Sequence, residues 1–208
     1  MNKQQMIELM KQKDSAYFEF YKKVKEKTNS LQWGVGVTPP YSLEPYRFEL
    51  LGNKPGKMLK KPSSPGKNRH CYFYDNQDRI IHAISYASLG GSTGNKSWIH
   101  NDDFYEYHDN SVIRYVYSGV FESGNDNELD RVVFIEINDG LITKTYELDK
   151  LNFEYMEAEY FYENNKIIYI DFLYPDSPVK NNKFKLIHEP NEIQIVELRN
   201  GIQIQIYP

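Results

Sequence analysis

The stretch 158–173, AEYFYENNKIIYIDFL, places two strand-forming runs on either side of a short polar turn. The first run is rich in tyrosine and phenylalanine, and the second begins with Ile-Ile-Tyr-Ile at 167–170. Aromatic and β-branched residues favour strands, whereas the Glu-Asn-Asn-Lys segment between them favours a tight turn. The stretch therefore predicts an antiparallel hairpin.

The same arrangement recurs along the second two-thirds of the chain. Asp139-Gly140 is among the strongest hairpin signals, because both turn positions favour positive φ. The final run alternates isoleucine with glutamine over 202–206, so one of its faces is expected to be buried and the other wet. The expected strand pairs are 72–74 with 80–87, 104–107 with 112–117, 131–137 with 141–148, the two halves of 158–173, and 184–188 with 193–198, followed by the strand 202–206.

Successive hairpins joined by short loops favour a meander. We therefore expect a mainly β protein (α+β by count), in which an antiparallel meander forms a large curved sheet, a sandwich or an open barrel. Residues 1–30 are expected to be a helical segment packed on the sheet, with a break in the helix at Asp14-Ser15. Residues 31–69 are expected to be an extended Pro/Gly/Lys-rich region and residues 70–208 the β domain, all within one domain overall.

Charge is unevenly distributed behind the net value of −4. Residues 1–101 hold 16 basic and 8 acidic side chains, residues 102–163 hold 4 and 16, and residues 164–208 hold 5 of each. The acidic middle section is also rich in tyrosine, a residue enriched at protein interfaces. Carboxylates held on a rigid sheet would steer a basic protein toward it. The predicted partner-binding residues are Asp102, Asp103, Tyr105, Glu106, Tyr107 and Asp109.

The alternative interpretation of this section is that its tyrosines pack in the core and its acids are ordinary solvated surface. A second alternative is a small-molecule-binding or hydrolytic protein with its site in the mouth of the sheet, using His82, His100 or His108.

Motifs for catalysis, cofactors or metals are weak. Cys71 is the single cysteine, and a neighbouring histidine on the same strand would point to the opposite face. The histidines and aspartates of 100–109 lack metal-binding spacing. The loop 90–97, GGSTGNKS, resembles a phosphate-binding loop, but Asn95 stands where the second glycine is needed. We predict no catalytic, cofactor-binding or metal-binding residues, and favour a protein that is not an enzyme.

Two resemblances bear on function. Tyr74-Asp75 and Tyr162-Glu163, at the ends of predicted strands, resemble the hairpin repeats of bacterial YD-repeat proteins, and Asp78-Arg79 provides the arginine usual after such a turn. A small acidic β-rich protein without a catalytic motif is also similar in type to the immunity proteins of bacterial polymorphic toxin systems. This resemblance implies a stoichiometric inhibitor that neutralises a toxin domain, often a basic nuclease, and it carries no residue roles.

Residues 1–13 hold no apolar run like the roughly 7–15 residues of a secretory signal. The longest apolar runs elsewhere fall far short of the roughly 20 residues of a membrane helix. We therefore expect a soluble cytoplasmic protein that does not bind membranes. Nucleic acid is not an expected partner, because the basic loop 52–69 holds no aromatic residue. The edge at 202–207 leaves pairing with a second copy open.

Overall fold

The computed structural model describes residues 1–208 except 91–96, 121–126, 178–180, 191 and 200. Its strands form one 13-stranded antiparallel sheet in the order β13-β12-β11-β10-β9-β8-β7-β6-β5-β4-β3-β1-β2. From β3 onward each strand therefore lies beside its neighbours in the chain, which confirms the predicted meander. The loop 90–97 that resembles a phosphate-binding loop lies mostly outside the described residues.

The strands are longer than the sequence runs that predict them. Their bounds are β1 (Ser30–Val35), β2 (Lys57–Met58), β3 (Arg69–Tyr74), β4 (Ile80–Gly90), β5 (Ser97–His108), β6 (Ser111–Val120), β7 (Glu128–Asn138), β8 (Leu141–Asp149), β9 (Tyr155–Glu163), β10 (Lys166–Leu173), β11 (Asn182–His188), β12 (Ile193–Arg199) and β13 (Ile202–Tyr207).

The tight turns confirm the hairpin signals in the sequence. Between β7 and β8, Asp139 and Gly140 have φ values of 50° and 78°. Between β9 and β10, Asn164 and Asn165 have φ values of 50° and 61°. Positive φ at both central residues matches the right-handed twist of the flanking strands, so these turns hold their hairpins in register.

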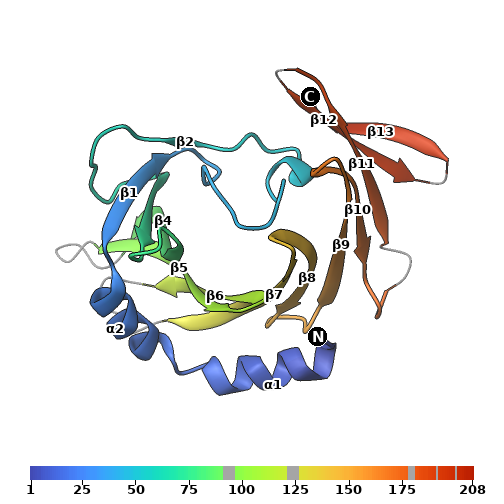
Figure 1. Ribbon diagram of the computed structural model, residues 1–208. Helices are drawn as coiled ribbons and strands as arrows, with labels where there is room; N and C mark the ends of the chain where they lie inside the picture. Colours follow the sequence, from blue (N-terminus) through green and yellow to red (C-terminus); the bar gives the residue numbers. More distant parts are fainter. Residues whose placement is uncertain (91–96, 121–126, 178–180, 191, 200) are drawn as a thin grey trace.

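The sheet curves around an interior and carries both helices on its outer face (Figure 1). The strand order ends at β13 on one side and β2 on the other, so hydrogen bonds do not close it into a barrel within the described residues. On β13, Ile202 and Ile204 are 64% and 41% exposed. Pairing of this edge with a second copy stays a prediction.

The helices are α1 (Lys3–Lys13) and α2 (Tyr17–Lys27), as the predicted break requires. Asn2 caps α1 in a capping box with Gln5. The buried face of the helices packs on the outer face of the sheet, where Tyr115 and Tyr117 are fully buried. Tyrosines of the acidic section therefore help to form the core. No helix in the described part of the chain is long and apolar enough to cross a membrane.

Residues 36–56 enter the space that the sheet encloses (Figure 1) and include the short 3-10 helix η1 (Glu49–Leu51). The region 31–69, expected to be extended, contributes the short strands β1 and β2 to the sheet. β1 pairs with β3 from Ser30 opposite Tyr74 to Val35 opposite Arg69, and β2 pairs with β1. The prolines at 39, 40 and 45 fall after β1, where they remove no hydrogen bond from the sheet.

Gly56 makes a close backbone contact where the interior segment leaves the sheet. A Cβ atom at this position would lie 2.6 Å from the carbonyl oxygens of Thr38 and Val35. Because both neighbours are backbone, Gly56→Ala is expected to lower the free energy of unfolding by about 1–3 kcal/mol, measured by urea denaturation. Gly66→Ala is the control, since its Cβ would approach most closely the flexible side chain of Arg69, at 3.2 Å. Equal effects of the two changes would contradict this packing.

Candidate functional site

The six predicted partner-binding residues do not share one face, because successive residues of β5 point alternately outward and inward. Asp102 and Glu106 point to the outer face, toward the helices, where Asp102 is fully buried. Asp103, Tyr105 and Tyr107 point to the interior, and Tyr105 is 9% exposed. The predicted single contact face is therefore wrong in its geometry. Asp109, in the β5–β6 turn, is exposed as predicted.

Asp102 is the centre of a polar cluster beneath α2. Its Oδ1 lies 2.5 Å from Nε2 of His82, and its Oδ2 lies 3.0 Å from Nε2 of His100 and 3.3 Å from the hydroxyl of Tyr17. Burial alone would raise the pKa of Asp102, but the hydrogen bonds from His100 and His82 outweigh it and lower the pKa to about 2. The cluster therefore holds a buried carboxylate that ties α2 to β4 and β5.

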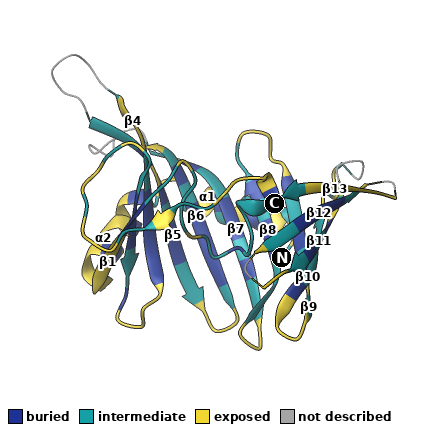
Figure 2. Cartoon of the chain, turned by 90° about the horizontal axis from the view of Figure 1, so that it is seen from above, coloured by how far each residue is buried: buried dark blue, intermediate teal, exposed yellow. Residues whose placement is uncertain are grey.

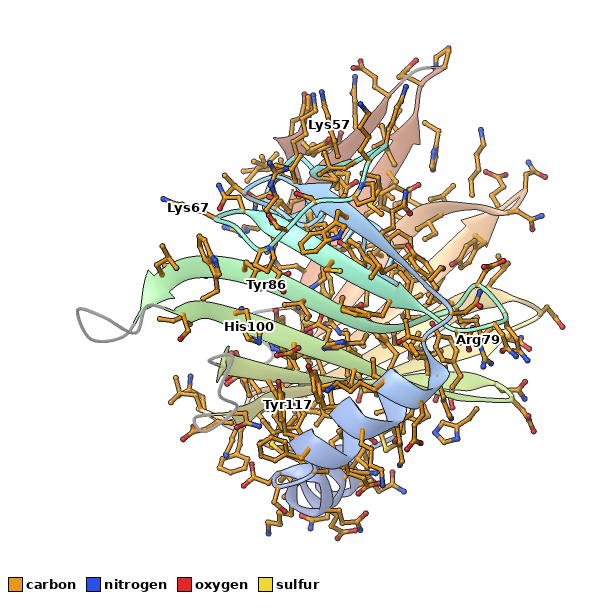
Figure 3. All side chains as sticks on the ribbon, turned by 90° about the vertical axis from the view of Figure 1, so that its left-hand side faces the viewer. Lys57, Lys67, Arg79, Tyr86, His100 and Tyr117 are labelled. Atoms are coloured by element: carbon orange, nitrogen blue, oxygen red, sulfur yellow. The ribbon has the colours of Figure 1, made fainter. Side chains whose placement is uncertain are left out.

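Two of the three histidines proposed for a site in the mouth of the sheet, His82 and His100, lie elsewhere. His82 is fully buried on the outer face and stacks on Phe104 at 4.4 Å between ring centroids. His100, labelled in Figure 3, is on the same face, because its Nε2 binds the same Asp102 carboxylate. His82 is 0% and His100 6% exposed, so neither ring is open to a substrate in the mouth of the sheet. Burial raises the pKa of the Cys71 thiol to about 12, so Cys71 does not provide a thiolate nucleophile at neutral pH.

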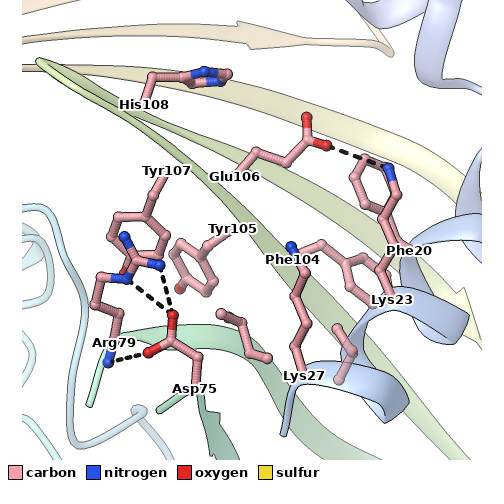
Figure 4. Close-up of a pocket in the computed structure, with 12 residues that line it drawn as sticks. Phe20, Lys23, Lys27, Asp75, Arg79, Phe104, Tyr105, Glu106, Tyr107 and His108 are labelled. Atoms are coloured by element: carbon pink, nitrogen blue, oxygen red, sulfur yellow. Dashed lines mark hydrogen bonds and ion pairs between the residues drawn. The ribbon is translucent and has the colours of Figure 1, made fainter. Parts of the chain in front are cut away.

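His108 lines a pocket of about 240 Å³ between α2 and the ends of β4 and β5 (Figure 4). Arg79 crosses this pocket, with its guanidinium 2.7 Å from Asp75 and 4.7 Å from the ring centre of Tyr107. Lys23 reaches toward Glu106 at 3.9 Å. The pocket is small for a ligand site, and two ion pairs, Arg79–Asp75 and Lys23–Glu106, lie in it, so we assign it a structural role.

The interior contains a charge network that the sequence analysis missed. Glu44, from the interior segment, is 4% exposed and lies 2.6 Å from Arg114 of β6 and 2.5 Å from Arg47. Burial would raise the pKa of Glu44, but these two guanidiniums outweigh it and lower the pKa to about 2. Arg114 also binds Asp103 at 3.2 Å. Arg47 and Arg131 both form ion pairs with Glu147, and Arg131 also forms one with Asp149.

This network fixes the interior segment to the sheet and divides the enclosed space. Two cavities of about 400 Å³ each are lined partly by Arg47 and Arg131. One is bordered by β3–β7, and the other by η1 and β8–β13. The only sequence signal for the network was Arg114, a charged residue within the apolar run 112–117 at an interior position of its strand.

Four acidic residues lie on consecutive hairpin turns at one end of the sheet, which we call the acidic turn row. Figure 2 shows the exposed turns along this end. Each of the four residues is exposed, and none forms an ion pair with another described residue. Strand pairing sets the order of the hairpins, so these four residues follow one another along this end of the sheet. The members are Asp109 (β5–β6), Asp139 (β7–β8), Glu163 (β9–β10) and Glu189 (β11–β12).

Metal-binding geometry is absent from the described part of the chain: no three His, Cys, Asp or Glu side chains come together as a metal-binding group.

No family model matches the chain, and no curated protein sequence is significantly similar to it. Among solved structures, the chain is similar to a porin-like protein from Bacteroides uniformis ATCC 8492, with 16% identity and a TM-score of 0.47. The similarity covers 66% of this chain and 51% of that protein, so the chain spans about half of its length. At this level of similarity no function is carried over.

Proposed function

We propose that this protein is a non-enzymatic binding protein that neutralises a basic protein partner and contacts it through the acidic turn row. The observation that carries the proposal is the placement of four exposed carboxylates, without ion pairs among the described residues, on neighbouring hairpin turns at one end of the sheet. The resemblance in type to immunity proteins supports a toxin domain as the partner, and the proposal places this binding in the cytoplasm.

The spacing of the row favours concerted action of its charges. Each hairpin adds two strands, and neighbouring strands lie about 4.8 Å apart, so successive turns are roughly 10 Å apart. This spacing is close to the Debye length of about 10 Å at 0.1 M salt. The four charges therefore act together on an approaching basic surface at moderate salt, and steering of this kind raises association rates.

Neutralising the row is expected to slow association with the partner at least about tenfold at low salt, with a smaller effect at high salt. The variant is Asp109→Asn, Asp139→Asn, Glu163→Gln and Glu189→Gln. Asparagine suits position 139, whose φ is 50°. The measurement is the association rate constant of the purified pair by stopped flow.

The control variant removes four acids outside the row, by the changes Glu8→Gln, Asp14→Asn, Glu128→Gln and Glu154→Gln. Both variants have the same net charge, so general electrostatic attraction falls equally in both. If the two variants associate at the same rate, net charge explains the effect and the row is not the contact surface.

A further inference from the structure

The interior cavity bordered by η1 and β8–β13 has features of a ligand site that the proposed protein contact does not use. Its volume of about 400 Å³ falls within the usual range for small-molecule sites, about 300–1,000 Å³. Four aromatic side chains line it, from three adjacent strands and the residue after β10: Tyr160, Phe172, Tyr174 and Phe184.

Charge in this cavity favours a positive ligand. Three carboxylates line it, those of Glu44, Glu147 and Glu197, against the guanidiniums of Arg47 and Arg131. The lining side chains therefore carry a net charge of −1, and Arg199, which is not part of the lining, forms an ion pair with Glu197. The carboxylates of Glu44 and Glu147 are already held by arginines of the network.

Glu197 also has an arginine partner, Arg199, but that arginine binds only one of its two carboxylate oxygens. Glu197 is 7% exposed, and its Oε1 accepts hydrogen bonds from Asn182 at 2.6 Å and from Arg199 at 2.7 Å. Its Oε2 has no hydrogen-bond partner among the described residues. Glu197 pairs directly with Phe184 across β12 and β11, so its carboxylate stands beside an aromatic ring on the interior face.

Aromatic faces and a nearly buried carboxylate together are the groups that recognise an organic ammonium ion, because the negative face of each ring attracts the cation. We propose that this cavity binds a small organic cation of the quaternary ammonium class. The cavity contains no residue of the acidic turn row, so this proposal does not depend on whether the protein binds a basic partner.

The test compares choline with 3,3-dimethyl-1-butanol, in which carbon replaces the charged nitrogen, by isothermal titration calorimetry with the whole protein. Choline is expected to bind, and its neutral isostere at least about tenfold more weakly. Equal binding of the two compounds, or no binding of choline, would overturn the proposal.

Substitution of Glu197 and substitution of its ion-pair partner Arg199 are expected to have opposite effects on choline binding. Glu197→Gln removes the charge with little change of shape and is expected to weaken choline binding at least about tenfold. Arg199→Gln removes the exposed positive charge that pairs with Glu197 and is expected to tighten choline binding. A general loss of structure would weaken binding in both variants, so the opposite signs separate recognition from folding. Weaker binding by Arg199→Gln would contradict the assignment of Glu197, and Phe172→Leu is a second weakening variant should Glu197→Gln fail to fold.

Discussion

Arg114→Met is expected to lower the free energy of unfolding by about 3–5 kcal/mol, the usual cost of leaving a buried charge without its partner. Arg114 is 4% exposed and binds both Glu44 at 2.6 Å and Asp103 at 3.2 Å. Methionine keeps much of the side-chain length but leaves Glu44 with Arg47 as its remaining ion-pair partner. Urea denaturation at neutral pH measures the change.

The double variant Arg114→Met, Glu44→Gln provides the control. It removes the Glu44 carboxylate, which Arg114→Met leaves with one of its two arginine partners, so it is expected to recover part of the loss. If Arg114→Met costs less than about 1 kcal/mol, the network does not fix the interior segment to the sheet. The two cavities that it separates would then lack a rigid boundary.

Asp102→Asn is expected to cost about 3 kcal/mol, since a neutral amide cannot replace a carboxylate that accepts hydrogen bonds from several buried side chains. His82 and Asp102 are both fully buried, so water cannot compensate. Asp109→Asn in the turn of the same hairpin is the matched control, and its effect is expected to stay within about 0.5 kcal/mol. A similar cost for the two changes would contradict the role of Asp102 in holding α2.

The same substitution is expected to change the response to acid. The pKa of Asp102 is lowered from 3.8 to about 2 in the folded protein, so the folded state stabilises the charged form. That contribution is fully present above pH 3.8 and is lost as the pH falls toward 2. The difference in stability between the wild type and Asp102→Asn is therefore expected to shrink over this interval. A difference that stays constant from pH 5 to pH 2 would contradict the lowered pKa.

The hairpins could be predicted from the sequence because their signals are local. Asp139-Gly140 and Asn164-Asn165 define turns within four residues, and the break between the helices is equally local. The sequence could not show that Glu44 and Arg47, in a proline-containing segment, pair with β6 and β8. Those contacts join residues 70 and 100 positions apart, and no spacing rule connects them.

The misplaced contact residues have a different physical origin. The acids and tyrosines of 102–107 were grouped by composition, although strand alternation sends Asp102 and Tyr105 to opposite faces. The sequence also could not show that the helices cover the outer face over β5. The helices therefore bury Asp102. Of the six predicted contact residues, Asp109 is the one that lies on the acidic turn row.

Affinity capture from a lysate of the source organism tests the central claim most directly, with the wild type, the neutralised-row variant and the four-acid control variant as baits, at low and high salt. The proposal predicts that the wild type and the control retain the same basic protein in stoichiometric amount at low salt. The neutralised-row variant is expected to lose it, and high salt to release it from all baits. Equal capture by the neutralised-row variant, or no basic protein retained by the wild type, would contradict the acidic turn row as the contact surface for a basic partner.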